Sequence, residues 1–190
     1  MRISGGAARG IPLVVPKGDA VRPATDGMRQ AVFSSLGERV AGARFLDLFA
    51  GSGAYGLEAL SRGAATGVFV EQNVRAASCV RRNIAAVCKS LGRDSDDLLI
   101  VQGDARSVPL GGAGQIPDLV FIDPPYEVIP ELAPGLLARL AVTLASKPEA
   151  IVVFELPGGC DLNPEGWILL KRLGKGARQP TVAFFRQGAA

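Results

Sequence analysis

The sequence contains no histidine among its 190 residues, and this absence excludes several kinds of chemistry. A Ser-His-Asp triad, a Cys-His nucleophile, a histidine-ligated metal and imidazole acid/base catalysis all require that side chain. Any reaction must therefore depend on carboxylates, hydroxyls, amides, aromatic rings, the backbone or a bound cofactor.

Cysteine and long apolar runs are also scarce. Cys79, Cys88 and Cys160 are widely spaced and odd in number, which favours reduced thiols over a disulfide framework or a zinc site. We therefore expect no metal.

No apolar run approaches the roughly 18 residues that span a bilayer, and the N-terminus lacks the apolar stretch of a signal peptide. These absences predict a cytoplasmic protein that does not contact a membrane.

Hydrophobic residues, by contrast, make up 48% of the chain against 21% charged residues, a balance typical of one globular domain. The net charge of +3 is distributed unevenly. Residues 1–44 hold seven Arg and Lys against three Asp and Glu, whereas residues 45–190 hold 14 against 15. The basic excess therefore lies in the N-terminal segment.

Short apolar runs alternate with helical periodicity along most of the chain. We expect strands at 44–50, 67–71, 98–105, 118–123, 150–156, 167–173 and 181–187, and helices at 28–40, 55–63, 74–91 and 131–145. This alternation predicts an α/β fold with a doubly wound, mainly parallel seven-stranded sheet, whose last two strands form an antiparallel hairpin at one edge. The predicted division is a basic arm with a short helix, residues 1–43, followed by the α/β domain, residues 44–190.

A glycine-rich loop, "DLFAGSGAYGLEAL", lies between the first expected strand and its helix. Gly51, Gly53 and Gly56 allow a ligand to approach the backbone closely, at the edge where doubly wound sheets bind cofactors. Glu71 ends the next strand about 20 residues later, where an acid can accept bonds from ribose hydroxyls. On these features alone, a dinucleotide and a nucleoside cofactor both remain possible.

Acids recur at successive strand ends and help to separate these two cofactors. Asp47, Glu71 and Asp104 suit a ligand that carries an amine, a ribose and an adenine, whereas acids near the loop would repel a pyrophosphate. We therefore expect cofactor binding by Asp47, Gly51, Gly53, Gly56, Glu71 and Asp104.

A second motif ends the fourth expected strand, in "LVFIDPPYE". Pro124 and Pro125 must terminate the strand because neither can donate to a sheet ladder. Asp123 and Tyr126 are thereby held at a stiff strand end.

With these motifs, residues 44–187 resemble the class I S-adenosylmethionine-dependent methyltransferases. The Asp-Pro-Pro-Tyr motif resembles the signature of the branch that methylates exocyclic amino groups of nucleobases. The whole chain, including "RISGGAARG", "VRPATDGMRQAVFSSL" and "FLDLFAGSGAYGLEALSRGA", resembles the bacterial 16S ribosomal RNA guanine-N2 methyltransferases. It departs from them at Gly27 and Gln30, where members usually carry Arg and Glu, and at Ala54-Tyr55, where they carry Ala-Leu.

The resemblance implies methyl transfer from S-adenosylmethionine to the N2 amine of a guanine in 16S ribosomal RNA. It implies that Asp123 and the Pro124 carbonyl accept the two N–H bonds of the amine, that Pro124 and Pro125 keep this geometry rigid, and that the base stacks on Tyr126. The expected partner is 16S ribosomal RNA or the small ribosomal subunit, and we expect a monomer. Several cations are needed to neutralise phosphates. The candidates for RNA contact are Arg2, Arg9, Lys17, Arg22 and Arg29.

Three alternatives stay open. Methylation of the N6 amine of adenine in RNA or DNA uses the same amine chemistry and differs only in the shape of the base pocket. An NAD-dependent oxidoreductase would explain the glycine loop but not the Asp-Pro-Pro-Tyr motif. A non-catalytic RNA-binding module on the same fold would not need the motif intact.

Overall fold

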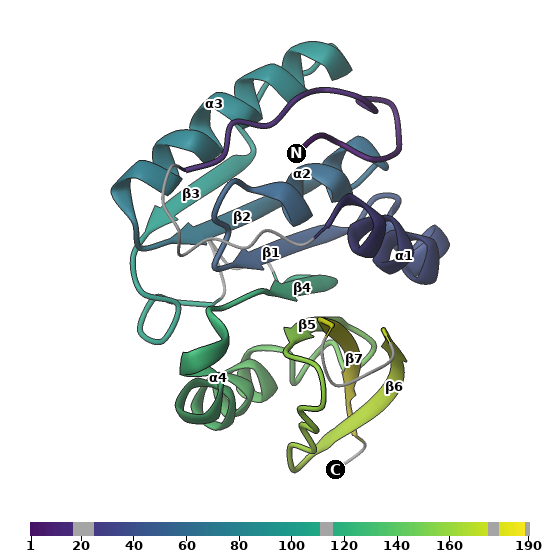
Figure 1. The fold of residues 1–190 in the computed structure, drawn as a ribbon, viewed down its shortest axis with the longest axis vertical. Helices are drawn as coiled ribbons and strands as arrows, with labels where there is room; N and C mark the ends of the chain where they lie inside the picture. The colour runs from purple at the N-terminus through teal and green to yellow at the C-terminus, as the bar shows by residue number, and fades with distance from the viewer. Residues whose placement is uncertain (17–24, 111–115, 175–178, 189–190) are drawn as a thin grey trace.

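The structure is a computed structural model that describes residues 1–16, 25–110, 116–174 and 179–188. A central sheet is covered by helices on both faces (Figure 1). The strands are β1 (Arg44–Leu48), β2 (Thr66–Glu71), β3 (Leu98–Gln102), β4 (Leu119–Ile122), β5 (Ile151–Leu156), β6 (Trp167–Leu173) and β7 (Thr181–Gln187). The helices are α1 (Asp26–Leu36), α2 (Ala54–Ser61), α3 (Val74–Leu91) and α4 (Ile129–Thr143), with 3-10 turns η1 (Gly37–Val40) and η2 (Tyr126–Val128). Within these ranges no helix is long and apolar enough to cross a membrane.

The seven strands are arranged in the order β3-β2-β1-β4-β5-β7-β6. The first five are parallel, and β7 is antiparallel to both β5 and β6. This confirms the predicted fold class, including the C-terminal hairpin. The sequence did not indicate that the second strand of the hairpin would be the one that joins β5. The reason is burial, because five consecutive residues of β7 are buried whereas most of β6 is exposed at the edge of the sheet.

The direction in which the chain extends the sheet reverses between β1 and β4. In open α/β sheets such a switch point, at the carboxyl ends of the strands, is where ligands bind. Three strands end earlier than expected: β1 at Leu48, and, with consequences for the site, β3 at Gln102 and β4 at Ile122. Asp104 and Asp123 therefore lie in the loops that follow these strands, at the ligand-binding edge.

Alternating strand residues divide the interior into two layers. Phe45, Phe69 and Phe121 belong to the core beneath α1, α2 and α3, while the other face of the sheet packs against α4. Gly56 allows α2 to approach the sheet this closely, because a Cβ there would lie 2.4 Å from the Phe69 ring and 2.5 Å from the Phe45 ring. The glycine loop and the carboxyl ends of β1 and β2 are thereby fixed relative to one another.

The N-terminal segment, residues 1–16, packs against the α/β core. Figure 1 shows it beside α2 and α3, and it contributes Ile3, Ala8 and Leu13 to the core beneath them. Its backbone bonds to the end of α2, where the Ala8 N–H donates to the Ser61 hydroxyl at 2.9 Å. Gly6 has φ +79°, and a Cβ there would lie 2.0 Å from the Ser61 carbonyl oxygen. These contacts do not test the predicted division at residue 43 or the RNA-docking role of the segment.

Candidate active site

The glycine loop begins with a strained turn directly after β1. Phe49 has φ +62°, the one positive value at a non-glycine residue within the described ranges, and Gly51 and Gly53 follow at +58° and +80°. Left-handed backbone at a bulky residue persists only where the surrounding structure enforces it, and such residues cluster at ligand sites. The turn brings backbone N–H groups to the carboxyl edge of the sheet.

Glu71 joins this loop to the start of α3. Its Oε2 accepts the Gly51 N–H at 2.8 Å, and its Oε1 accepts the Asn73 N–H at 2.7 Å. Each carboxylate oxygen keeps a second lone pair for an outside donor such as a ribose hydroxyl. The predicted ribose acceptor is therefore held rigidly at the loop.

Asp47 is the acid beneath the loop. It is 2% exposed, and its Oδ2 accepts the Gly56 N–H at 2.9 Å. Burial raises the pKa of this carboxyl to about 8, and the nearby Glu71 carboxylate contributes to the increase. A buried acid with a raised pKa favours a ligand that brings positive charge, because that charge would stabilise its ionised form. The methionyl ammonium of S-adenosylmethionine has this property.

Asp104 occupies a more open position after β3. Its carboxylate pairs with Arg106 at 2.6 Å and also accepts the Arg106 backbone N–H at 2.9 Å. The side-chain hydrogen bond from Arg106 lowers the pKa of Asp104 below its ordinary value. A cofactor would have to share this carboxylate with Arg106, and its predicted role stays a prediction.

The Asp-Pro-Pro-Tyr motif follows β4 as expected. Pro124 is buried, and Tyr126 begins η2 in a half-buried position. Burial raises the pKa of Asp123 well above its ordinary value, and the carboxylates of Glu155 and Asp47 raise it further. Asp123 is therefore a stronger base than an ordinary carboxylate when it is ionised.

The analysis of the sequence missed Glu155, in β5. This side chain is 3% exposed, and it accepts the Tyr55 hydroxyl at 3.0 Å and the Tyr126 hydroxyl at 3.4 Å. Burial raises its pKa, while the two tyrosine hydrogen bonds oppose the increase. An acid inside the otherwise apolar run "AIVVFEL" was the available signal, because a buried carboxyl requires partners.

The sheet register places these acids together. Ile122 pairs with Phe154, so Asp123, which directly follows β4, lies beside Glu155 in β5. Strand alternation puts both on the face covered by α1 and α2, the face that also carries Asp47. Two buried carboxyls, Asp47 and Glu155, and the half-buried Asp123 thus gather at the switch point, next to the glycine loop.

The structure corrects the prediction that Arg29 contacts RNA. This side chain is fully buried, where its Nε donates to Glu58 at 3.2 Å and its guanidinium pairs with Asp26 at 2.7 Å. Arg29 also donates to the Arg2 carbonyl oxygen at 2.5 Å. It therefore ties α1 and α2 to the N-terminal segment and does not present its charge to a phosphate.

Of the other predicted RNA contacts, Arg2 and Arg9 are exposed, whereas Lys17 and Arg22 lie outside the described residues. Helix α3 carries a further group of exposed cations, which the sequence analysis did not single out as RNA contacts. Helix α3 contains no acidic residue. Its exposed cations are Arg75, Arg81, Arg82 and Lys89.

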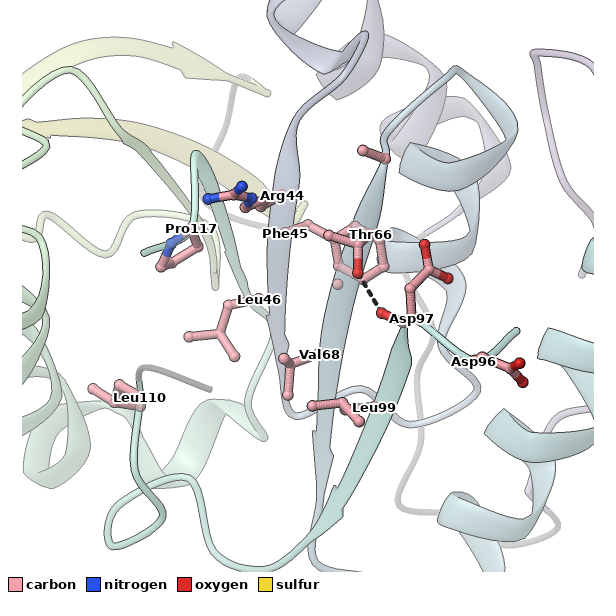
Figure 2. Close-up of a pocket in the computed structure, with 12 residues that line it drawn as sticks. Arg44, Phe45, Leu46, Thr66, Val68, Asp96, Asp97, Leu99, Leu110 and Pro117 are labelled. Atoms are coloured by element: carbon pink, nitrogen blue, oxygen red, sulfur yellow. Dashed lines mark hydrogen bonds between the residues drawn. The ribbon is translucent and has the colours of Figure 1, made fainter. Parts of the chain in front are cut away.

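A cavity of about 370 Å³ lies at the opposite edge of the sheet. Figure 2 shows Arg44 and Thr66, at the starts of β1 and β2, among the residues that line it. Thr66 hydrogen bonds to the backbone of Asp97 there. The acids and the glycine loop lie at the carboxyl ends of the strands, so this cavity is separate from the candidate active site.

Known proteins resemble this chain in sequence and in fold. A family model described as "Conserved hypothetical protein 95" matches residues 1–184. The chain belongs to this family. "Ribosomal RNA small subunit methyltransferase D" of Escherichia coli strain K12 is 38% identical over 126 residues, 66% of this chain and 60% of that protein. The aligned segment therefore spans less than two thirds of that relative's length.

Two further matches extend along more of the chain. The protein of the same name from Haemophilus influenzae is 31% identical over 173 residues, 90% of this chain and 86% of that one. The solved structure titled "Putative methyltransferase yhhF from Escherichia coli" superposes with a TM-score of 0.75 at 30% identity, covering 100% of this chain and 99% of its own. This match therefore covers nearly the full length of both chains.

Proposed function

We propose that this protein transfers a methyl group from S-adenosylmethionine to the exocyclic N2 amine of a guanine in 16S ribosomal RNA. The observation that carries the proposal is the position of Asp123 and Tyr126. They leave β4 beside the glycine loop and Glu71, so an amine acceptor and a cofactor would meet at the switch point. The names of the relatives support the reaction type and the RNA substrate.

The residues at the loop fit the proposed cofactor. Glu71 would accept its ribose hydroxyls, and Asp47 would face its ammonium, which provides the positive charge that this buried acid lacks. Bound there, S-adenosylmethionine supplies an electrophilic methyl group on a sulfonium, which becomes a neutral thioether when the methyl leaves.

The contribution of the chain is to prepare the acceptor nitrogen. The lone pair of an exocyclic guanine amine is delocalised into the ring, so the amine is a poor nucleophile until it becomes pyramidal. Asp123 and the Pro124 carbonyl would accept its two N–H bonds and direct the lone pair toward the methyl group. The nitrogen gains a carbon and must lose a proton. An ionised Asp123 would take that proton, and its raised pKa makes its carboxylate a stronger base than usual.

We propose that the RNA docks through exposed cations on the N-terminal segment and on α3. Arg2 and Arg9 lie on the N-terminal segment, and α3 adds a face free of acidic residues. Arg75 and Arg82 are seven residues apart, so they lie on the same side of the helix about 10 Å from each other. Such a surface suits a phosphate backbone.

The decisive experiment is mass-spectrometric mapping of modified nucleotides in ribosomal RNA from a strain that lacks the protein. We expect one N2-methylguanine to disappear from 16S RNA and to return with the parental gene, but not with Asp123→Ala. Loss of an N6-methyladenine instead would establish the alternative acceptor. Unchanged RNA would refute the proposal.

A further inference from the structure

Glu155 has no assigned part in the proposed reaction, although it lies at the centre of the candidate active site. Its partners come from two separate elements. Tyr55 stands in the first turn of α2, directly after the glycine loop, and Tyr126 belongs to the Asp-Pro-Pro-Tyr motif. One buried carboxyl therefore links the cofactor loop to the motif that receives the base.

The two tyrosines are held to different degrees. Tyr55 is 5% exposed, and its ring stacks on Phe121 with a centroid distance of 5.3 Å and an angle of 16°. Its hydroxyl is a fixed donor to Glu155. Tyr126 belongs to a three-residue turn in which no residue is buried. The Tyr126 ring is half-buried and packs against the core beneath α4, and the contact with Glu155 restrains its hydroxyl end.

The length of the second contact is informative. O–H···O hydrogen bonds usually measure about 2.5–3.0 Å, and the Tyr126 hydroxyl lies 3.4 Å from Glu155 Oε1. The contact is therefore longer than usual for a hydrogen bond between two oxygens. Polar contacts in active sites commonly tighten only when the substrate is in place.

The charges around Glu155 favour its role as an acceptor. Tyr55 from α2 and Tyr126 from η2 donate to it and so stabilise its ionised form. Directly after β4, Asp123 receives no such hydrogen bond within the described part of the chain, and the Glu155 charge raises its pKa. Farther off, the charge of Asp47 on β1 also raises the pKa of Asp123. The charge of Arg29 on α1 acts to lower the pKa of Tyr55.

We infer that Glu155 is a positioning residue that anchors the Tyr126 ring, through its hydroxyl, at the orientation on which the target base stacks. Tyr55 holds the carboxyl in place from the opposite side. The inference rests on the proposed function, in which Tyr126 receives the base. Replacing Tyr126 by Phe keeps the stacking surface but removes the anchor, and Glu155→Gln weakens the anchor while nearly preserving the shape of the side chain.

The anchor can be tested without any substrate. The chain has two tyrosines, so ¹³C-labelled tyrosine gives two sets of ring signals, which Tyr55→Phe and Tyr126→Phe assign. In Glu155→Gln we expect the Tyr126 signals to shift and to show faster ring motion, while the stacked Tyr55 ring stays rigid. The matched control is Glu127→Gln, which removes an exposed acid beside Tyr126 and should leave both sets unchanged. Unaltered Tyr126 signals in Glu155→Gln would overturn the inference.

A kinetic double-mutant cycle tests the consequence for catalysis. We expect Glu155→Gln and Tyr126→Phe each to lower kcat about tenfold, with little change in cofactor affinity, and the double variant to be no slower than either single one. If the double variant loses kcat by the product of the two single losses, positioning through Tyr126 is refuted. A loss of cofactor affinity as large as the loss of kcat would refute it as well. A parental protein inactive on ribosomal RNA would count against the proposed function alone, because the tyrosine spectra decide the anchor independently.

Discussion

Asp47 should make the stability of the protein fall as the pH rises. Its pKa is about 8 in the folded protein against an ordinary 3.8, so the folded state keeps a proton that the unfolded chain has lost. A folded pKa raised in this way gives stability that is complete below about pH 4 and is lost progressively up to about pH 8. Each unit of pKa difference corresponds to about 1.4 kcal/mol, so the loss at pH 7 is at most about 4 kcal/mol.

The variant Asp47→Asn isolates this effect. An amide oxygen can still accept the Gly56 N–H, but the side chain no longer titrates. Urea unfolding at pH 5 and pH 8 should show that the parental protein loses about 3–4 kcal/mol more than the variant between these values. Asp123 and Glu155 also have raised pKa values and act in the same direction, so the difference between the two proteins is the quantity that reports Asp47.

The matched control is Asp96→Asn, because Asp96 is exposed on the surface. Its pH dependence should equal that of the parental protein. If Asp47→Asn and the parental protein lose the same free energy of unfolding between pH 5 and pH 8, then Asp47 is ionised throughout and the reasoning is wrong. Calorimetry adds a second check, because binding of a cationic cofactor near Asp47 should release a proton at pH 7, which titrations in buffers of different ionisation enthalpy would detect.

Three further outcomes are expected. Asp123→Ala should abolish methyl transfer while the calorimetric affinity for S-adenosylmethionine stays within about twofold, since its proposed partner is the base; parental turnover would contradict this role. Gly56→Ala should lower the free energy of unfolding in urea by about 2 kcal/mol or more, because the added methyl overlaps two phenylalanine rings; unchanged stability would show that α2 can move away. Arg75→Glu with Arg82→Glu should weaken RNA binding and reduce its salt dependence, whereas Arg39→Glu, on the exposed turn after α1, should not; equal losses would point to general charge attraction.

The parts of the site that could be predicted are those with local signals. The glycine loop, Glu71 and the Asp-Pro-Pro-Tyr motif are each defined by a few consecutive residues at the end of an apolar run. The alternation of strands and helices then placed them at one edge of a parallel sheet, and the structure agrees. A motif whose chemistry and backbone geometry lie within one short segment needs no knowledge of distant contacts.

Arg29 and Glu155 could not be read in the same way, because their partners are far away in the sequence. Arg29 meets Glu58 across 29 residues, and Glu155 meets Tyr55 across 100. A weaker signal existed for Arg29, since it shares a helical face with Val32 and Phe33, and charges on an apolar face are buried and paired. The composition of the N-terminal segment concealed this by suggesting that every cation there was available to RNA.

The position of β7 bears on how the protein is completed during synthesis. This strand follows β6 in the chain but lies between β5 and β6 in the sheet. Until residues 181–187 leave the ribosome, β5 has one open edge and β6 has no neighbour to pair with. An open edge on a buried strand is a site of unwanted pairing between chains. Glu155 lies on that strand and pairs in register with Val182 of β7, so the strand that carries this acid of the candidate active site stays unpaired on one side until the seventh strand has been made.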